Sequence, residues 1–340
     1  MPSKKPVNVI ALTSSNLERN LTLRLRVLLM LPFLSANGYE VEIIQLESSR
    51  KKRVEQLGKL PHADLIWIHR HIFSWRELQK LKRLRAKRVF DHDDPVGFSS
   101  SNFANLAPKK WLRYQLTVRS SSAVIAASPG LVKLANPKKG NVYHIPLCAE
   151  PNQYSLKTNP RLENETFRLL WIGGHSTFKY LEYCVPMLEA IGKAIDNIEL
   201  IVVGHSKLTL ESLKVVNIQW SPEQEREQFT RCHVGLVPTT NDRWTRAKAT
   251  LKPLQYMASG LPLIAPPVGV LVDFADNGKN GLLATNAQEW VAAIEKLKNN
   301  ESLRITMGEN GINYVKAHHS VEVLAPKVLQ VFESVLKRTA

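Results

Sequence analysis

Short apolar runs alternate with helix-like segments along the first half of the chain. Runs rich in branched apolar residues are typical of buried strands, and the segments between them repeat apolar residues at helical spacing. The predicted strands are Val7–Leu12, Tyr39–Gln45, Asp64–His69, Arg88–Asp91, Ala123–Ala127 and Asn141–Pro146. The predicted helices are Leu21–Ala36, Trp75–Arg85, Lys109–Ser120 and Pro129–Ala135. Because strands that alternate with helices form parallel sheets, the pattern predicts a doubly wound α/β domain.

The same alternation starts again after Cys148–Thr166, a polar and irregular stretch that we interpret as a domain linker. The predicted strands of this half are Phe167–Ile172, Ile198–Val203, Val216–Trp220, Val234–Pro238, Leu261–Ala265 and Gly281–Ala284. The predicted helices are Thr177–Ala194, Pro222–Cys232, Ala287–Leu297 and, with one continuous apolar stripe, Ser320–Lys337. Because strands and helices alternate in the same way in both halves, the sequence predicts two Rossmann-like domains that face each other across a cleft.

The stretch from Lys248 to Gly269 reads KATLKPLQYMASGLPLIAPPVG. Lys248 and Lys252 are four residues apart, so on one helix their ammonium groups would share a face. Gly260 is expected to end this helix, and a short buried strand then leads into a Pro-Pro-Val-Gly turn. A glycine just past a parallel strand lets a phosphate approach the backbone closely. Two lysines beside such a turn predict a pocket for a diphosphate.

Three carboxylates and an imidazole, Asp91-His92-Asp93-Asp94, follow the strand that ends near Phe90. The carboxyl end of a strand is where α/β folds place their chemistry. Asp and His are also ligands of divalent metals, which makes a metal site one alternative. A capping and turn cluster is another, since Asp-Pro is a common turn pair. Because three acids among four residues are dense for a turn, we favour a functional role.

Two further strand ends carry candidate residues. Gly173 and Gly174 end a strand before a helix, where amide N–H groups bind anions, although a tight turn without a ligand has the same sequence. His69-Arg70-His71 ends another strand, and either a pocket or a structural role of partly buried histidines fits it.

The formal net charge of +16 is concentrated in the first half of the chain. Residues 1–150 hold 25 Lys and Arg against 11 Asp and Glu, a net of +14, and the rest of the chain is close to balance. A dense basic stretch runs from Lys80 to Arg88, and Trp111 and Tyr114 lie among further lysines and arginines. Such segments bind anionic membrane surfaces or nucleic acid, or form a solvated face. We favour an anionic partner.

Several classes of protein are disfavoured. No apolar run approaches the length of about 20 residues that spans a bilayer. Cys148, Cys184 and Cys232 are far apart, which indicates free thiols in a reducing cytoplasm and neither disulfides nor a zinc site. No G-x-G-x-x-G follows the first strand, which counts against a nicotinamide-dependent dehydrogenase.

Together these motifs resemble the retaining glycosyltransferases of family 4, which have the two-domain fold called GT-B. The resemblance covers residues 165–320 well and the first half more loosely. It is carried by LLWIGGHSTFKYL at 169–181, VGLVP at 234–238, the stretch at 248–269, NGKNGLLATNAQEW at 277–290 and MGENGINYVKAHHS at 307–320.

The resemblance implies a nucleotide-sugar donor, with a UDP-, GDP- or ADP-sugar as the alternatives, held mainly by the second domain. It implies a glycan or lipid-linked acceptor held by the first. Asp91 and His92 are the candidates for the residue that supports the transferred sugar, and Lys252 is the third candidate catalytic residue. The donor-binding positions are Gly173, Gly174, Lys248, Gln255, Gly269 and Val270. The resemblance implies no metal and no cofactor, because family members mostly need none.

The chain departs from the family pattern at three positions. The family usually has two glutamates eight residues apart, the second of which contacts the donor ribose, and this chain has Ala247 and Gln255 there. His175 replaces the arginine that usually follows the glycine turn. These changes match a divergent branch with a Lys-Lys-Gln version of the motif.

We therefore expect a retaining, hexosyl-type glycosyltransferase of surface polysaccharide or glycolipid synthesis, cytoplasmic and peripheral to the membrane. The expected domains are 1–150 for the acceptor, 165–319 for the donor, and a helix at 320–340 that crosses back to the first domain. The alternatives are a non-catalytic binding protein of the same fold, a sugar-nucleotide 2-epimerase, and a nucleic-acid-binding module, for which charge is the only argument; no nucleic acid is expected.

Overall fold

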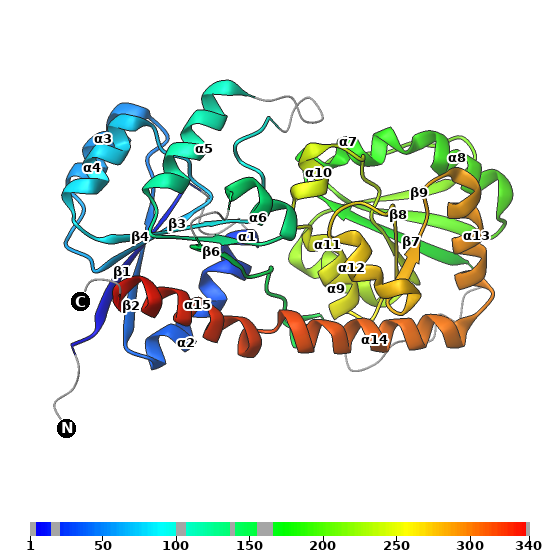
Figure 1. Ribbon diagram of the computed structural model, residues 1–340. Helices are drawn as coiled ribbons and strands as arrows, with labels where there is room; N and C mark the ends of the chain where they lie inside the picture. Colours follow the sequence, from blue (N-terminus) through cyan, green and yellow to red (C-terminus); the bar gives the residue numbers. More distant parts are fainter. Residues whose placement is uncertain (1–4, 15–20, 100–106, 137–139, 155–165, 338–340) are drawn as a thin grey trace. The chain divides into compact units, whose positions relative to one another are not determined.

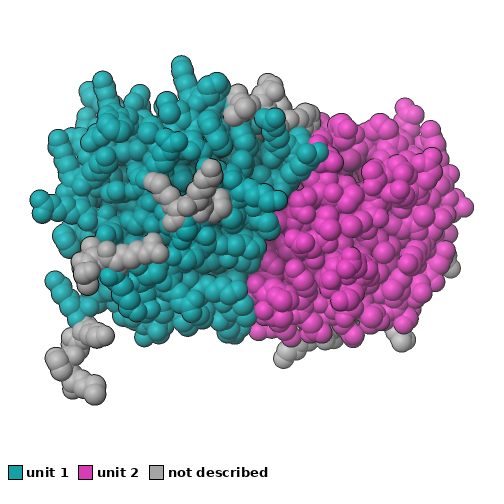
Figure 2. Space-filling model, in the orientation of Figure 1, with its two compact units in different colours: residues 1–148, 242–249, 321–340 teal, residues 149–241, 250–320 magenta. Residues whose placement is uncertain are grey.

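The computed structural model describes residues 5–14, 21–99, 107–136, 140–154 and 166–337. Most of the predicted linker, residues 155–165, lies outside these residues. The chain divides into two compact units (Figure 2). Unit 1 comprises residues 1–148, 242–249 and 321–340, and unit 2 comprises residues 149–241 and 250–320. A short segment between two parts of unit 2 therefore belongs to unit 1.

Unit 1 contains a six-stranded parallel sheet in the order β2-β1-β3-β4-β5-β6. Its strands are β1 (Val7–Thr13), β2 (Tyr39–Gln45), β3 (Leu65–His69), β4 (Lys87–His92), β5 (Ala123–Ala126) and β6 (Val142–His144). The chain leaves β1 toward β2 on one side and places β3 on the other, so the order of the strands reverses between β1 and β3. In open α/β sheets, ligands bind outside the carboxyl ends of the strands at such a switch point.

Helices cover both faces of this sheet (Figure 1). One face packs against α1 (Leu21–Arg26), η1 (Leu28–Met30), α2 (Leu31–Ala36) and α15 (Val321–Lys337). The other packs against α3 (Arg50–Gly58), α4 (Trp75–Arg83), α5 (Pro108–Ser120) and α6 (Pro129–Ala135). Alternate residues of β1 serve the two cores: Val9 and Ala11 face the first, and Ile10 and Leu12 face the second. Burial on both faces explains why this strand is a continuous apolar run.

Unit 2 contains a second six-stranded parallel sheet, in the order β12-β11-β10-β7-β8-β9. Its strands are β7 (Phe167–Gly173), β8 (Ile198–Gly204), β9 (Lys214–Gln219), β10 (Val234–Leu236), β11 (Leu263–Ala265) and β12 (Gly281–Leu283). The order reverses between β7 and β10, which makes this the ligand-binding edge expected for unit 2. The parallel sheets predicted from the alternating pattern are present in both units.

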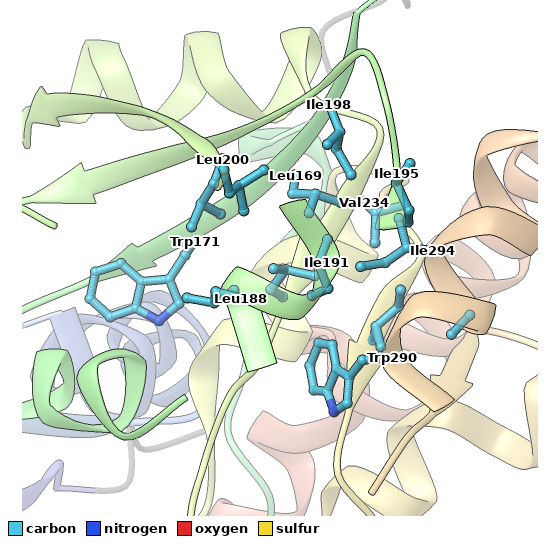
Figure 3. Packing of buried hydrophobic residues seen from close by; sticks show 14 of the residues in the cluster. Leu169, Trp171, Leu188, Ile191, Ile195, Ile198, Leu200, Val234, Trp290 and Ile294 are labelled. Carbon is cyan, nitrogen blue, oxygen red and sulfur yellow. The ribbon is translucent and has the colours of Figure 1, made fainter. Parts of the chain in front are cut away.

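The helices of unit 2 are α7 (His175–Tyr183), α8 (Val185–Ala194), α9 (Pro222–Arg231), α11 (Leu251–Ala258), α12 (Leu271–Ala275), α13 (Ala287–Lys298) and α14 (Glu301–His319), with short 3-10 turns η3 (Pro151–Gln153) and η4 (Asp276–Gly278). Figure 3 shows the core that α8 and α13 form with the sheet. Its buried side chains include Leu169, Trp171 and Leu200 of the strands, Leu188 and Ile191 of α8, and Trp290 and Ile294 of α13.

Two predicted helices are broken in the structure. Leu21–Ala36 forms α1, η1 and α2 in succession, and Thr177–Ala194 lies within α7 and α8. Pro32 and Pro186 occupy the first turns of α2 and α8. Because proline cannot donate the backbone hydrogen bond of a helix interior, each marks a new helix start.

Helix α14, which the apolar pattern did not predict, holds α11 by a close backbone approach. A Cβ atom added at Gly308 would lie 2.1 Å from the carbonyl oxygen of Gly260, and one at Gly311 would lie 3.1 Å from the Cβ of Met257. Only glycine fits at Gly308, so these two glycines set how closely α14 approaches the end of α11. Among the described residues, no helix is long and apolar enough to cross a membrane.

Candidate functional site

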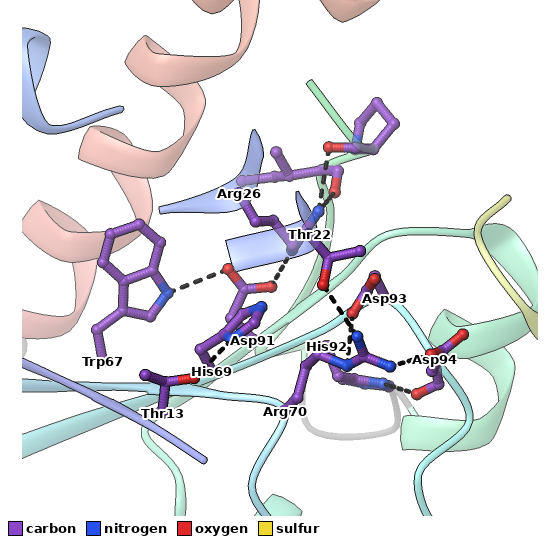
Figure 4. A network of polar contacts seen from close by, with 12 residues as sticks. Thr13, Thr22, Arg26, Trp67, His69, Arg70, Asp91, His92, Asp93 and Asp94 are labelled. Carbon is purple, nitrogen blue, oxygen red and sulfur yellow. Dashed lines mark hydrogen bonds and ion pairs between the residues drawn. The ribbon is translucent and has the colours of Figure 1, made fainter. Parts of the chain in front are cut away.

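Polar side chains gather at the carboxyl ends of β1, β3 and β4 in unit 1 (Figure 4). The hydroxyl of Thr13, at the end of β1, lies 3.1 Å from Nδ1 of His69 at the end of β3. These two strands flank the switch point of the sheet. The network therefore occupies the edge where a ligand of unit 1 is expected.

Asp91 of β4 is buried, and both of its carboxylate oxygens are engaged. Oδ1 forms an ion pair with Nε of Arg26, and Oδ2 accepts a hydrogen bond of 3.1 Å from the indole N–H of Trp67. Arg26 also donates to the backbone carbonyls of Ile145 and Pro146, at 3.0 and 3.1 Å. Burial raises the pKa of Asp91, and Arg26 and Trp67 oppose that rise. Asp91 thus joins α1, β3, β4 and the segment after β6.

His92 is fully buried and presents one unpartnered ring nitrogen. Its ring stacks on Phe90 at 4.8 Å and meets the edge of Tyr114 at 5.5 Å. Nδ1 lies 3.2 Å from the backbone carbonyl of Asp94, and since a carbonyl only accepts, Nδ1 carries the hydrogen. Burial lowers the pKa of His92 to about 4, so the ring is neutral at pH 7. Nε2 is then an acceptor, and it has no hydrogen-bond partner within the described part of the chain.

Arg70, the middle residue of the His69-Arg70-His71 motif, holds the remaining acids, a role that the sequence did not indicate. It has a positive φ of 60°, a conformation that costs an ordinary residue free energy. Its guanidinium donates to the hydroxyl of Thr22 at 2.9 Å and forms ion pairs with Asp93, at 3.1 Å, and Asp94. Burial lowers the pKa of Arg70, but the two carboxylates together raise it above its ordinary value. The acids that resembled a metal site are therefore paired with cations, and no described set of His, Cys, Asp or Glu could hold a metal ion.

Lys248 and Lys252 do not share a helix, which corrects the prediction from their spacing. Lys248 follows α10 (Arg243–Ala247) with an extended ψ of 139°, and α11 begins only at Leu251. Lys248 belongs to unit 1, where its Nζ lies 3.7 Å from Oδ1 of Asp94. Lys252 belongs to unit 2.

The segment that carries Lys248 is fixed to unit 1 by backbone contacts. The amide of Ala249 donates to the backbone carbonyl of Asp93 at 2.9 Å, and the hydroxyl of Ser128 donates to the carbonyl of Ala247 at 2.5 Å. A Cβ atom added at Gly130 would lie 2.6 Å from the Cα of Ala247. The close contact explains why position 130 requires glycine.

In unit 2, Lys252 lies at the glycine turn that ends β7. Its Nζ is 3.3 Å from the hydroxyl of Thr177 and 4.2 Å from the ring centroid of Trp171. Gly174 is the N-cap of α7, and its carbonyl accepts from the amide and the hydroxyl of Thr177, both at 3.0 Å. A Cβ atom at Gly173 would lie 2.5 Å from the Trp171 ring, so this position requires glycine. The structure thus brings Gly173, Gly174 and Lys252 together.

The other predicted donor residues lie on α11 and at the start of α12. Gln255 is buried in the described structure, and its Nε2 donates to Oε1 of Glu225 at 2.8 Å. Gly269 follows β11 with a left-handed φ of 55°, which favours glycine, and Val270 is the N-cap of α12. Glu225 was not among the predicted site residues.

The fold is of the GT-B type, with two α/β units that each contain a six-stranded parallel sheet. Sucrose-phosphate synthase from Thermosynechococcus elongatus matches with a TM-score of 0.75 at 17% identity, over 98% of this chain and 100% of that one. HepE of Anabaena, solved in complex with UDP and glucose, matches with a TM-score of 0.70 at 16% identity, over 96% and 100% of the two chains.

Residues 166–300 match the family model of glycosyl transferases group 1. An uncharacterized glycosyltransferase of Methanocaldococcus jannaschii is 32% identical over 127 residues, which are 37% of this chain and 34% of that protein. The D-inositol 3-phosphate glycosyltransferase of Corynebacterium aurimucosum is 35% identical over 97 residues, 28% of this chain and 22% of that protein. The matched part thus spans about a third or less of these relatives.

Proposed function

We propose that the protein is a glycosyltransferase that transfers a hexose from a nucleotide-sugar donor, with retention of configuration, to a glycan or lipid-linked acceptor. The observation that carries this proposal is the position of Lys252, whose ammonium lies beside the glycine turn at the end of β7. That turn borders the switch point of the sheet in unit 2 and lies within the stretch that matches the family model.

The proposed chemistry is stabilisation of a diphosphate leaving group. As the bond to the sugar breaks, negative charge develops on the diphosphate, and a fixed ammonium stabilises it without reorganisation. Lys252 would supply that charge, and the amides after Gly174 at the N-terminus of α7 would donate hydrogen bonds. Gly269 and Val270 are proposed to supply backbone contacts at the turn after β11. The proposed role of Lys248 in donor binding stays a prediction, since its observed partner is Asp94 of unit 1.

In unit 1, the contacts favour His92 over Asp91 as the group that meets a sugar. Asp91 is only 1% exposed and both of its oxygens are occupied by Arg26 and Trp67, so its proposed role is to hold β4 in place. The unpartnered Nε2 of His92 can accept a hydrogen bond from a sugar hydroxyl. A buried polar atom without a partner calls for a ligand or water.

The donor is proposed to be a UDP-sugar in the first instance, because HepE was solved with UDP-glucose. GDP-sugars and ADP-sugars are the alternative donors and would be assayed in the same way. Ala247 and Gln255, in place of the usual glutamates, favour a non-catalytic nucleotide-sugar-binding protein as the second candidate function. Turnover separates the two, because a binder shows a thermal shift with a UDP-sugar but releases no UDP.

Lys252→Met is expected to lower kcat/KM for donor hydrolysis at least ~10-fold, the scale of one charge-assisted hydrogen bond. Methionine keeps an unbranched side chain at this position and removes the ammonium group that lies over Trp171. Lys296→Met, at an exposed position of α13, is the matched control and should leave the rate unchanged. Steady-state release of UDP from UDP-sugars checks this. If the rate of Lys252→Met is unchanged, Lys252 is not part of the donor site. If the wild-type protein turns over no nucleotide sugar, the protein is not a glycosyltransferase.

An anionic membrane surface is the proposed partner of unit 1. Helices α3, α4 and α5 lie on one face of the sheet, and their exposed basic residues have no ion pair within the described chain. These are Arg50, Lys51, Lys52, Arg76, Lys82, Arg83, Lys109, Lys110 and Arg119. Trp75 and Leu112, 58% and 60% exposed, lie on the same helices. Exposed apolar side chains among cations suit the headgroup region of a bilayer.

Flotation with vesicles tests this partner. Replacing Lys51, Lys52 and Lys82 by glutamine is expected to weaken binding to phosphatidylglycerol vesicles about 100-fold, since each basic residue contributes about 1 kcal/mol. The same change at Lys193, Lys207 and Lys296 of unit 2 is the control for net charge. High salt should abolish binding. Equal flotation on phosphatidylcholine vesicles would rule out the anionic surface.

A further inference from the structure

The buried amide of Gln255 and the carboxylate of Glu225 form a pair within unit 2. Nε2 of Gln255 donates to Oε1 of Glu225 at 2.8 Å, and the indole N–H of Trp220 donates to Oε2 at 2.7 Å. Two neutral donors from different elements therefore fix the orientation of one carboxylate. Gln255 is on α11, Glu225 on the first turn of α9, and Trp220 directly follows β9.

The helix that carries Gln255 packs across the switch point of the sheet. Tyr256, the next residue on α11, places its hydroxyl 3.3 Å from the carbonyls of Leu170 in β7 and Leu236 in β10. The same hydroxyl accepts from the amide of Ile172 at 3.2 Å. These contacts hold α11 across the two strands where the order of the sheet reverses. Ligands of such sheets bind at this edge.

We propose that Glu225 binds the ribose hydroxyls of the donor nucleotide and that Gln255 is its positioning residue. The inference rests on the proposed function, because it assumes a nucleotide donor in unit 2. Rossmann-like sheets use an acidic residue for the ribose hydroxyls, because a carboxylate is a strong acceptor of their hydrogen bonds. At position 255 this chain has an amide, and the carboxylate is supplied from α9 instead.

A glutamine at position 255 is compatible with a carboxylate at position 225. A carboxylate at position 255 would face that of Glu225, and two carboxylates that close disfavour each other's ionisation. A glutamine there turns the contact into a hydrogen bond, so a charged Glu225 requires a neutral residue at 255. The carboxylate that is missing at position 255 is therefore supplied by Glu225.

The spacing on α11 gives the bound nucleotide a direction. Lys252 and Gln255 are three residues apart on one helix, which is about 4.5 Å along its axis. The ammonium of Lys252 attracts the negatively charged diphosphate. The carboxylate of Glu225 accepts hydrogen bonds from neutral hydroxyl groups and repels phosphate. The diphosphate end therefore lies at Lys252 and the nucleoside end at Glu225, as adjacent parts of one ligand.

Calorimetric titration of the full chain tests the inference. Wild-type protein is titrated with UDP, GDP and ADP, and the nucleotide that binds is compared with its 2′-deoxy and 3′-deoxy forms. We expect Glu225→Gln to weaken binding of the ribonucleotide 10- to 100-fold and to leave at least one deoxy form unaffected. Glu223→Gln, on the same turn of α9 at a 73% exposed position, is the matched control and should bind like wild type.

A second variant keeps the test independent of folding effects. Glu225→Gln combined with Gln255→Glu moves the carboxylate across the same hydrogen bond and should recover discrimination between ribose and deoxyribose. Glu225→Gln with wild-type affinity and discrimination would overturn the inference while leaving the proposed function intact. A wild-type chain that binds none of the three nucleotides would overturn both.

Discussion

Arg26→Met is expected to lower the free energy of unfolding of unit 1 by about 3–5 kcal/mol, the cost of removing one partner from a buried ion pair. Arg26 and Asp91 are 3% and 1% exposed, so neither charge can be hydrated once the other is lost. The substitution also leaves the backbone carbonyls of Ile145 and Pro146 without their donor. Hydrogen exchange of the amides in β3 and β4 measures this loss in unit 1 alone.

Two controls separate the ion pair from other effects. Arg76→Met, at an exposed position of α4, should change stability by no more than about 0.5 kcal/mol. Arg26→Met combined with Asp91→Asn removes both charges and should recover part of the loss. If Arg26→Met is as stable as Arg76→Met, the ion pair does not support unit 1.

The stability of unit 1 is expected to fall as the pH drops from 6.5 toward 4, because two buried histidines resist protonation. Burial lowers the pKa of His69 to about 3 and that of His92 to about 4, from an ordinary value of 6.5. At these two residues the folded state therefore binds fewer protons than the unfolded state in this window. The stabilisation is fully present above pH 6.5 and is lost as the pH falls toward the folded values. Each histidine contributes about 1.4 kcal/mol per pH unit.

Unfolding by guanidinium at pH 7, 6, 5 and 4.5 measures this slope. His69→Gln should reduce it by about one proton, or about 1.4 kcal/mol per pH unit. His62→Gln, at an exposed position, should not change it. A slope that is the same in His69→Gln and wild type would show that His69 titrates alike in the folded and unfolded states.

The central strands could be predicted because burial on both faces leaves a simple apolar signal. The edge strand Tyr39–Gln45, in which apolar and polar residues alternate at first, was predicted with the bounds that the structure has, and so was the helix Pro129–Ala135. Helix α14 gave no such signal, because Gly308 and Gly311 lie on its packed side, and glycine disfavours helices in isolation. Tertiary packing against α11 overrides that preference.

The sequence indicated candidate side chains but not the partners that the structure gives them. Asp91 and His92 could not be told apart in sequence, because the partner that occupies Asp91 is 65 residues away. For Lys248 and Lys252 a local signal existed. Pro253 is the third residue of α11, and proline is favoured in the first turn of a helix, although α15 contains Pro326 as its sixth residue. Pro253 therefore favours a helix that starts close to Lys252 over one that includes Lys248.

The contact between α14 and α11 affects how a substitution at Gly308 would be interpreted. Gly308 touches no residue of the proposed donor site, yet a methyl group there would collide with the carbonyl of Gly260 at the end of the helix that carries Lys252 and Gln255. Replacing this glycine is expected to shift α11 and to weaken the proposed binding of a nucleotide. A survey of such replacements would then identify Gly308 as a ligand contact, although it acts only as the spacer between two helices.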